Sequence, residues 1–194
     1  QMGLNIETLN IATNENDVLT RTINTSVHEL NKVCETSSPS IDIQISSNFE
    51  RLIYDNCKDP EYIKTIMTDL NNEGRYILKK EVLDKIRKTF CSYSIKSNEV
   101  KEIIKKYNDM YEITLDPHTA VAIGASKKNL SQHDISIILS TAHPAKFKDT
   151  VSDIIGNDDF VPNDIINMMK KDDNFVILDN NVDTIKNYLK ENML

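Results

Sequence analysis

Glycine is scarce in this chain: it occurs at four of the 194 positions, and no two of the four lie close together. Loops that wrap the phosphate of a nucleotide or a phosphorylated cofactor normally contain several clustered glycines. The sequence therefore carries no phosphate-binding turn of the usual kinds. The chain also begins Gln1-Met2-Gly3-Leu4 and runs almost at once into a strand-like segment, so we expect a further segment upstream of it.

Cysteine and long apolar runs are equally scarce. Cys34, Cys57 and Cys91 are odd in number and widely spaced, which excludes a disulfide framework and favours a cytoplasmic location. The four histidines share no ligand spacing with each other or with the cysteines, so no metal site is expected. The longest apolar runs are too short to cross a bilayer, and no signal-peptide pattern is present. We therefore expect no membrane association.

The charge distribution excludes another class of partner. The net charge is −7, and acidic and basic residues are interspersed. Nucleic-acid-binding proteins usually present a basic stripe, and none is found here, so no nucleic-acid partner is expected. A hydrophobic fraction of 39% and a charged fraction of 27% are ordinary for a globular protein. Length alone predicts one domain, or one large domain with an appendage.

Strand and helix patterns alternate along the chain and predict an α/β fold. Leu9 to Thr13 reads as a short buried strand, followed by a polar turn and a helix containing Val18, Leu19 and Ile23. Ile135 to Leu139 is a continuous apolar run, as expected of a central parallel strand. Shorter strands are predicted near Val33 and at Val176 to Leu178.

Helix starts and apolar spacing predict the remaining elements. Ser47 with Glu50 forms a capping-box pattern, and Asp59-Pro60 and Asp116-Pro117 are typical helix starts. Gly74 is predicted to end the helix that begins at Asp59-Pro60, and another helix is predicted to begin at Ser97. Apolar residues at helical spacing indicate further helices at four places: Val82, Ile86 and Phe90; Phe147 to Ile155; Ile165 to Met169; and Val182, Ile185 and Leu189. The region from Cys57 to Tyr111 is amphipathic and rich in lysine and glutamate. We interpret it as a peripheral helical insertion.

Four polar clusters fall at the ends of predicted strands or the starts of predicted helices. They are Thr13 to Asp17, Ser46 to Asn48, Asp116 to Thr119, and Ser140 to His143. Ligands of open α/β sheets bind beyond the carboxyl ends of strands, and helix N-termini favour anions. Each cluster also has an ordinary structural explanation, because Ser and Asp cap helices and Asn and Asp form turns. These residues alone do not identify a reaction.

Phe147-Lys148-Asp149 is similar to the sequence around the Schiff-base lysine of several pyridoxal-phosphate (PLP) enzymes. The helical spacing argues against that role. With Phe147 and Val151 on the buried face, Lys148 should face solvent, where its amine stays protonated and non-nucleophilic.

Five strings in a fixed order resemble threonine synthase. They are Thr13-Asn14-Glu15-Asn16-Asp17, Ser38-Pro39-Ser40-Ile41-Asp42, Ser46-Ser47-Asn48-Phe49-Glu50-Arg51-Leu52, Leu115-Asp116-Pro117-His118-Thr119-Ala120, and Ser140-Thr141-Ala142-His143-Pro144-Ala145-Lys146-Phe147. They extend over nearly the whole chain to about Gly156, and the remainder matches less distinctly.

The resemblance implies a fold and an activity. The fold is the tryptophan-synthase-β-like fold (fold type II) of PLP enzymes, of which this chain would be the C-terminal part. Residues 1–56 and 114–194 would belong to the PLP-dependent α/β domain, and residues 57–113 would be the helical insertion. The family's activity is that of a PLP-dependent lyase, which converts O-phospho-L-homoserine and water into L-threonine and phosphate. Its Schiff-base lysine and its phosphate-binding loop lie in the N-terminal half. We therefore expect no catalytic residue in this chain and no activity of the chain alone.

The resemblance also implies roles for individual residues. By its position in the last string, Thr141 would offer a hydroxyl to the pyridine nitrogen of PLP. Ser47, Asn48 and Arg51 would contact the substrate phosphate. Supporting roles beside the ring fall to Asp116, His118, Ser140 and His143. Alternatively, Asn48 supports the site from a distance, and Arg51 pairs with Glu50 or Asp55.

The expected partners are a small-molecule substrate, O-phospho-L-homoserine, and the N-terminal half of the same enzyme. Half of an α/β sheet leaves apolar surface uncovered, so the isolated chain is expected to self-associate. Two alternatives remain. The chain could be a non-catalytic remnant or docking half that needs a separate N-terminal partner, or it could come from a related fold-type-II enzyme with another substrate.

Overall fold

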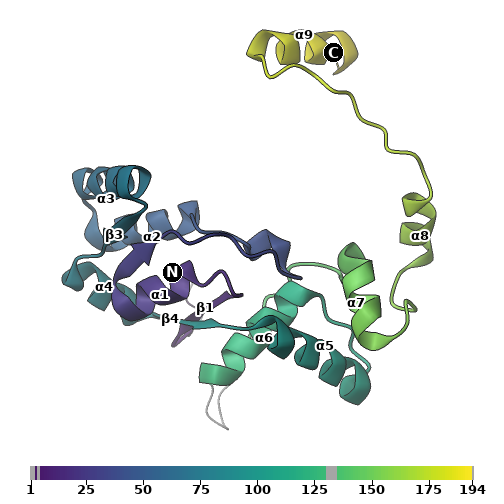
Figure 1. The fold of residues 1–194 in the computed structure, drawn as a ribbon, viewed down its shortest axis with the longest axis horizontal. Coiled ribbons are helices and arrows are strands. Elements are labelled where there is room, and N and C mark those ends of the chain that lie inside the picture. The colour runs from purple at the N-terminus through teal and green to yellow at the C-terminus, as the bar shows by residue number, and fades with distance from the viewer. Residues whose placement is uncertain (1–2, 4, 130–134, 194) are drawn as a thin grey trace. The chain divides into compact units, whose positions relative to one another are not determined.

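The structure is a computed structural model that describes residue 3 and residues 5–129 and 135–193 (Figure 1). The chain divides into two compact units, residues 1–161 and residues 162–194.

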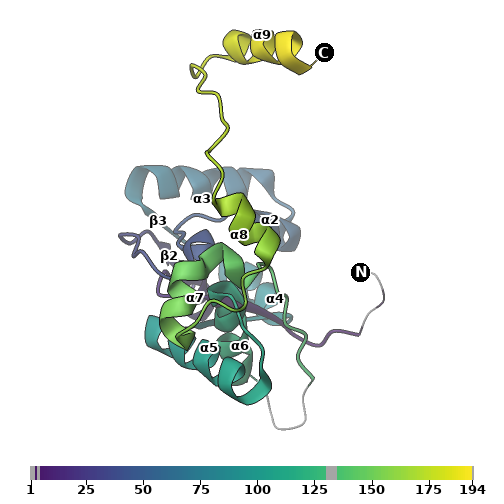
Figure 2. The ribbon, with the colours of Figure 1, turned by 90° about the vertical axis from the view of Figure 1, so that its right-hand side faces the viewer.

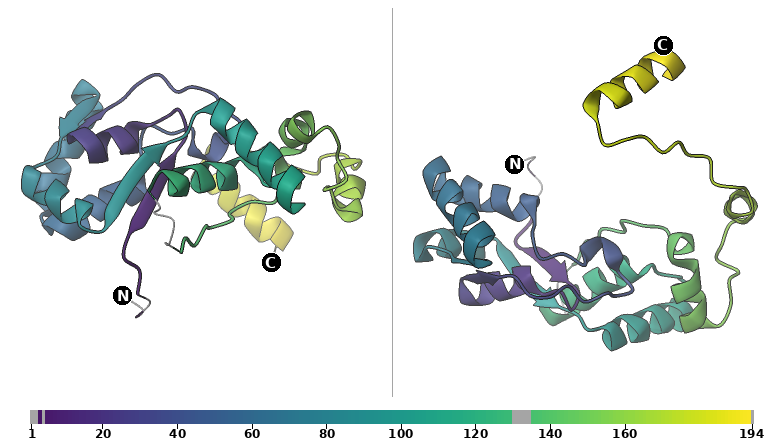
Figure 3. Two further views of the ribbon diagram at one scale, coloured as in Figure 1. Left: turned by 90° about the horizontal axis from the view of Figure 1, so that it is seen from below. Right: turned by 45° about the horizontal axis from the view of Figure 1, so that its top comes forward.

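A parallel pair of strands lies at the centre of the first unit. Strand β1 (Leu9–Thr13) pairs with β4 (Phe90–Ser94), and the register runs from Leu9 opposite Phe90 to Thr13 opposite Ser94. The two strands lie side by side in Figure 3. The predicted strand Leu9 to Thr13 is thus confirmed at both ends.

The two faces of this sheet are covered by different helices. Ile11 packs into a first core cluster that includes Ile23 of α1 (Val18–Thr25), whereas Ala12 packs into a second cluster with Val121 of α6 (Pro117–Asn129). Since successive side chains of a strand point to opposite faces, α1 and α6 cover opposite faces of the sheet. Coverage on both faces is typical of parallel sheets in α/β proteins.

The first core cluster is built largely from helices that follow α1. These are α2 (Ser47–Cys57), α3 (Pro60–Glu73) and α4 (Lys80–Arg87), and beside them β2 (Val27–Glu29) pairs antiparallel with β3 (Arg75–Ile77). Helix α3 begins after Asp59, whose side chain accepts a hydrogen bond from the Tyr62 amide, and it ends at Gly74 with φ +70°. Both ends of this helix match the prediction. An aspartate side chain caps the first turn, and glycine adopts the left-handed backbone conformation that ends the helix.

The second core cluster joins α5 (Ser97–Tyr111) and α6, and α7 (Lys148–Ile155) lies against α5 (Figure 2). Gly124 of α6 permits a close approach, because a Cβ there would lie 3.0 Å from Ile103 Cδ1 and 3.1 Å from Ile95 Cδ1. Two short 3-10 turns, η1 (Pro39–Ile41) and η2 (Pro144–Phe147), complete the first unit.

The second unit contains α8 (Asn163–Met169) and α9 (Val182–Met193). Its described side chains from 162 to 192 are all exposed or half-buried. The predicted helices at Ile165 to Met169 and Val182 to Leu189 are confirmed. The predicted strand at Val176 to Leu178 is wrong: the segment has no regular structure, and Ile177 is 84% exposed.

Other predicted elements are corrected by the structure. Ile135 to Leu139 is not a strand, since it pairs with no strand among the described residues. The strand expected near Val33 is instead β2, at Val27–Glu29. Phe90 does not continue a helix but begins β4, because α4 ends at Arg87. The cap of α2 is Ser46, whose side chain accepts the Phe49 amide, and Ser47 is the first helical residue.

The region interpreted as a helical insertion is not purely helical. Residues 57–113 include β3 and β4, and β4 forms the central pair with β1. The division of the chain at residues 57 and 113 stays a prediction. Within the described part of the chain, no helix is long and apolar enough to cross a bilayer.

Candidate functional site

A buried polar network lies at the carboxyl end of β1. The Asn14 side-chain amide donates to Ser38 Oγ at 3.0 Å and to Asp42 Oδ1 at 2.6 Å, while its oxygen accepts the Asn16 amide at 2.9 Å. Asn16 in turn holds the main chain of Cys34, donating to its carbonyl and accepting from its N–H, each at 2.8 Å. Both asparagines are buried. The loop from Cys34 to Asp42 is therefore fixed to the end of the strand.

Asp42 closes this loop on itself. Its Oδ2 accepts the Thr36 amide at 2.8 Å, and its Oδ1 accepts the Thr36 hydroxyl at 2.7 Å. Charge-assisted bonds of this kind are stronger than neutral ones, so the loop is held in one conformation. The 3-10 turn η1, which contains Ser40, lies inside it.

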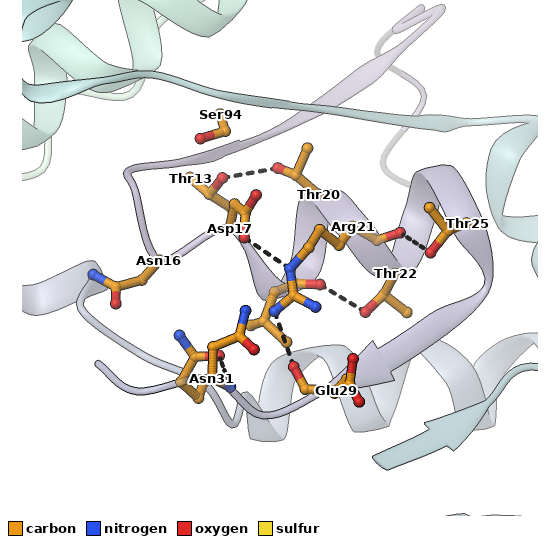
Figure 4. A network of polar contacts seen from close by, with 12 residues as sticks. Thr13, Asn16, Asp17, Thr20, Arg21, Thr22, Thr25, Glu29, Asn31 and Ser94 are labelled. Atoms are coloured by element: carbon orange, nitrogen blue, oxygen red, sulfur yellow. Dashed lines mark hydrogen bonds and ion pairs between the residues drawn. The ribbon is translucent and has the colours of Figure 1, made fainter. Parts of the chain in front are cut away.

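Hydroxyl and ionic contacts hold the polar turn between β1 and α1 (Figure 4). The Thr13 and Thr20 hydroxyls lie 2.8 Å apart, and Thr20 Oγ1 lies 2.8 Å from Ser92 Oγ on β4. Arg21 Nε donates to Asp17 Oδ1 at 2.8 Å, and its Nη2 donates to the Glu29 carbonyl at 2.9 Å. These contacts connect the turn to β4 and to β2.

Asp116 organises the start of α6. Its carboxylate is 1% exposed and accepts the His118 amide at 2.9 Å, the Thr119 amide at 3.3 Å and the Thr119 hydroxyl. A buried charge needs such a full set of donors, because an unpaired one would be strongly destabilising. Asp116 therefore caps the helix and fixes the side chains beside it.

His118 connects this cap to the loop at β1. Its Nδ1 lies 3.1 Å from Asp116 Oδ1, and its Nε2 accepts the Ser40 amide at 3.2 Å. Since Nε2 accepts the Ser40 amide, Nδ1 is the nitrogen that faces Asp116, and the imidazole bridges Asp116 and Ser40. The ring also lies 4.8 Å from the ring of Phe147 in η2.

The segment from Ser140 to Phe147 meets the same cluster. Ser140 Oγ lies 3.5 Å from Thr119 Oγ1, and Thr141, the next residue, is exposed. His143 is exposed and accepts the Ala145 amide on its Nδ1 at 3.2 Å, so it caps η2. The structure thus brings Asp116, His118 and Ser140 together, with Thr141 beside them.

Ser47, Asn48 and Arg51 form a separate group at the start of α2. The Arg51 guanidinium donates to Asn48 Oδ1 and, at 3.4 Å, to the Ser47 carbonyl. The expected alternative of pairing with Glu50 or Asp55 is wrong among the described contacts, and Asp55 instead pairs with Lys58 at 2.7 Å. No hydrogen bond between described residues joins this group to the Asp116 cluster.

Lys148 lies outside these clusters. Its Nζ pairs with Asp158 Oδ2 at 3.0 Å, and the side chain is 30% exposed. The side chain is therefore half-buried and engaged in an ion pair, away from the Asp116 cluster. Among the residues that the structure describes, no three His, Cys, Asp or Glu side chains converge as metal ligands would.

His28 is a buried residue for which no role was predicted from the sequence. Its ring stacks on Tyr76 at a centroid distance of 4.6 Å, Nε2 lies 3.2 Å from the Gln44 carbonyl, and Nδ1 lies 3.0 Å from Thr22 Oγ1. Burial lowers the pKa of His28 to about 4. The residue anchors the chain just before α2, and no spacing in the sequence marks it.

Several residues of the cluster were not singled out as site residues from the sequence. Asn14, Ser38, Ser40, Asp42 and Thr119 lie inside the five strings but look like ordinary turn formers. Their membership of the five ordered strings was the signal in the sequence that could have identified them. Four of those strings now meet through hydrogen bonds. Asn14 bonds to Ser38, the Ser40 amide bonds to His118, and Thr119, which bonds to Asp116, also contacts Ser140.

Comparisons with known proteins show what this chain is similar to. The model of the family "Threonine synthase, C-terminal" matches residues 119–189. Threonine synthase of Saccharomyces cerevisiae is 38% identical over 177 residues, which cover 80% of this chain and 34% of that protein. The solved structure of PLP-bound threonine synthase from Brucella melitensis superimposes with a TM-score of 0.87 at 34% identity, covering 98% of this chain and 41% of that one. The solved yeast enzyme gives a TM-score of 0.83 at 33% identity, covering 98% and 43%.

The architecture is accordingly that of part of a fold-type-II PLP enzyme, so the predicted α/β fold class is confirmed. Within that class, the resemblance to threonine synthase is confirmed, and the chain corresponds to the C-terminal portion. It spans between about a third and about two fifths of the length of these relatives.

Proposed function

We propose that this chain is the C-terminal portion of a threonine synthase, a PLP-dependent lyase that converts O-phospho-L-homoserine and water into L-threonine and phosphate. The observation that carries the proposal is the meeting of four family-like strings in one cluster beside the exposed Thr141. Buried polar networks that rigidify a surface loop are expected where a ligand must be positioned.

The residues present fit a PLP pyridine ring. Thr141 offers an exposed hydroxyl, while the carboxylate of Asp116 is buried and engaged by His118 and Thr119. A hydroxyl can hydrogen-bond the ring nitrogen without protonating it, so Thr141 would moderate the ring as an electron sink. PLP, when bound, supplies that electron sink. In this proposal, Ser140 and His118 position the segment that carries Thr141.

Ser47, Asn48 and Arg51 would bind the phosphate of the substrate. The start of α2 presents backbone N–H groups, and the exposed Arg51 guanidinium already lies over the same turn. A helix N-terminus and a guanidinium both suit a phosphate group. Asn48 would orient Arg51 through the contact between their side chains.

As the resemblance implies, the cofactor-bearing lysine would lie in a part of the enzyme outside these 194 residues. Lys148, the lysine of the Phe-Lys-Asp sequence, is engaged by Asp158. The chain alone would then be inactive and would act together with that part, in the cytoplasm. Exposed apolar side chains such as Ile135 and Ile177 lead us to propose that the isolated chain also self-associates. Sedimentation of the purified chain at several concentrations would detect this.

The activity is tested by reconstitution. The purified chain is mixed with PLP and the separately produced N-terminal portion of Brucella melitensis threonine synthase, and phosphate release from O-phospho-L-homoserine is measured. We expect the mixture to release phosphate and to show the absorbance of lysine-bound PLP, while the chain alone does neither. PLP binding by the mixture without any phosphate release would contradict the proposed reaction.

A further inference from the structure

His28 is a buried polar side chain that has no part in the proposed reaction as described so far. It is 2% exposed and lies on β2 directly opposite Tyr76 of β3. The two rings stack at a centroid distance of 4.6 Å with 6° between their planes. Buried polar groups normally find hydrogen-bond partners inside the protein. The partners of the two ring nitrogens therefore show what this side chain holds in place.

One ring nitrogen of His28 holds the chain just ahead of α2. Nε2 lies 3.2 Å from the carbonyl oxygen of Gln44, and because a carbonyl only accepts, Nε2 donates this bond. Nδ1 lies 3.0 Å from the hydroxyl of Thr22 on α1. Burial lowers the pKa of His28 to about 4, so near pH 7 the ring carries a single proton. That proton is engaged by Gln44.

The same ring also contacts the first turn of α2. Its centroid lies 6.2 Å from that of Phe49, which is 4% exposed, and the two planes are 20° apart. Gln44 is held a second time, because its side-chain oxygen accepts the Asn31 amide at 3.1 Å. His28 thus contacts the chain on both sides of Ser47, at a residue before the helix and at a residue within its first turn.

Two backbone amides at the start of α2 remain available to a ligand. The Ser46 side chain accepts the Phe49 amide, and the Ser46 carbonyl accepts the Glu50 amide. Among the hydrogen bonds between described residues, the Ser47 and Asn48 amides donate to no acceptor. The first N–H groups of a helix lack partners within it and suit an anion. Their direction depends on the path by which the chain enters the helix.

We infer that His28 is a positioning residue for the phosphate site proposed at the start of α2, an inference that rests on the proposed function. The buried ring acts through Gln44 and not by contact with the phosphate. Its bond to the Gln44 carbonyl fixes the path into α2, and so the direction of the Ser47 and Asn48 amides. Hydrogen bonds weaken steeply when they are misaligned. Loss of the bond from His28 therefore weakens phosphate binding while every phosphate-binding residue is still present.

Three substitutions separate the bond to Gln44 from the packing of the ring. His28→Gln places an amide N–H as many covalent bonds from the main chain as Nε2 is, so it still donates to Gln44. His28→Asn places its amide where Nδ1 lies, beside Thr22, and does not reach Gln44. His28→Phe keeps the stacked ring and has no donor. The Gln and Asn variants lose the ring alike, so urea unfolding should show similar losses of stability for these two.

Phosphate binding is measured first in the reconstituted enzyme. His28→Asn and His28→Phe should raise KM for O-phospho-L-homoserine roughly tenfold, whereas His28→Gln should change it by less than about threefold. The value of kcat should stay within about threefold in all three variants, because a contact to phosphate that is made in both the ground state and the transition state affects KM alone.

A second measurement does not depend on turnover. Inorganic phosphate is titrated into the full chain, and the amide signals of Ser47 and Asn48 are followed by NMR. These signals should shift in the original chain and in His28→Gln at similar phosphate concentrations, and at roughly tenfold higher concentrations in His28→Asn and His28→Phe. The Phe variant keeps the core filled, so it decides the question even if the two amide variants do not fold.

The outcomes separate the inference from the function on which it rests. Unchanged phosphate binding in His28→Phe, or equal weakening in the Gln and Asn variants, would overturn the role of the bond to Gln44. An original chain whose Ser47 and Asn48 signals do not respond to phosphate would overturn it as well. The expected order of the variants in the NMR titration, together with no phosphate release by the reconstituted mixture, would support the role of His28 and contradict the proposed function.

Discussion

At the scale of single residues, two aspartates that precede prolines have different surroundings. Asp59 caps α3 with one hydrogen bond, to the Tyr62 amide at 3.1 Å, and is half-buried. Asp116 is buried and engages two backbone amides, the His118 ring and the Thr119 hydroxyl. The sequence predicts the same helix-start role for both. The additional partners of Asp116 come from its position beside His118 and Thr119.

These different surroundings predict that replacing Asp116 lowers the free energy of unfolding more than replacing Asp59 does. Asp59→Ala loses a cap and should lower the free energy of unfolding by about 1 kcal/mol. Asp116→Ala also leaves buried donors without an acceptor, so it should cost about 2–4 kcal/mol. Urea unfolding of the two variants measures both values. Equal losses would show that the buried cluster adds nothing beyond a helix cap.

His28 should make stability depend on pH. The unfolded side chain has an ordinary pKa near 6.5, whereas burial lowers the pKa of the folded one to about 4. Below pH 6.5 the unfolded state therefore binds a proton that the folded state does not, and the free energy of unfolding should fall by roughly 3 kcal/mol as the pH drops from 7 to 4.

Urea titrations at several pH values measure this slope. His28→Phe keeps a flat ring beside Tyr76 but cannot titrate, so it should lack this contribution to the slope. His143→Gln, at an exposed position, should retain it. An unchanged slope in His28→Phe would show that His28 is not the group responsible.

Thr141 can be tested through its hydroxyl in the reconstituted enzyme. Thr141→Val keeps the shape and removes the hydrogen bond proposed to the cofactor, so kcat for phosphate release should fall roughly 10- to 100-fold. Thr141→Ser retains a hydroxyl and should stay within about threefold of the original kcat. Equal kcat values for the Val and Ser variants would contradict the role of the hydroxyl.

At the scale of elements, local signals were sufficient where an element is stabilised within the chain. The start of α3 at Pro60, its stop at Gly74 and strand β1 could be predicted, because each depends on local capping or on burial against α1 and α6. Ile135 to Leu139 has an equally strong strand pattern but no pairing partner among the described residues. Periodicity predicts which face is apolar, whereas strand formation also needs a neighbour.

The contacts of the candidate site were predictable only in part. Asp116, His118 and Ser140 were proposed together from the sequence and lie together in the structure, and their roles stay predictions. The bonds from Asn14 to Ser38 and from Ser40 to His118 connect residues too far apart in sequence for any local pattern to indicate. The contact between Asn48 and Arg51 is local and was likewise missed, since charge alone favours an acidic partner for arginine.

Gly124 decides how closely α6 packs against its neighbours. Gly124→Val would place side-chain atoms against Ile95 and Ile103, where a Cβ alone lies 3.0–3.1 Å from their carbons. Overpacking of this kind should lower the free energy of unfolding by about 2 kcal/mol. Ala122→Val, at a half-buried position of the same helix, should cost under about 1 kcal/mol. Urea unfolding distinguishes the two, and similar losses would indicate a helix-propensity effect.

At the scale of the whole molecule, the two units differ in what stabilises them. Residues 1–161 contain both core clusters, whereas no described side chain from 162 to 192 is buried. A segment that buries no core contributes little to stability. Both core clusters lie within residues 1–161, so a chain truncated after Val161 should still fold and unfold in a cooperative transition. Thermal and urea unfolding of the truncated chain measure this, and a non-cooperative transition would show that the two clusters do not suffice for folding.

The pairing of β1 with β4 has a consequence for how the chain is made. Leu9 pairs with Phe90, so the central strand pair cannot form until most of the first unit has left the ribosome. At synthesis rates of about 5–20 residues per second, β1 waits on the order of ten seconds for its partner. The sheet must then close over a long sequence separation, which slows folding. Chaperones that hold exposed strands would be most useful to this protein during that interval.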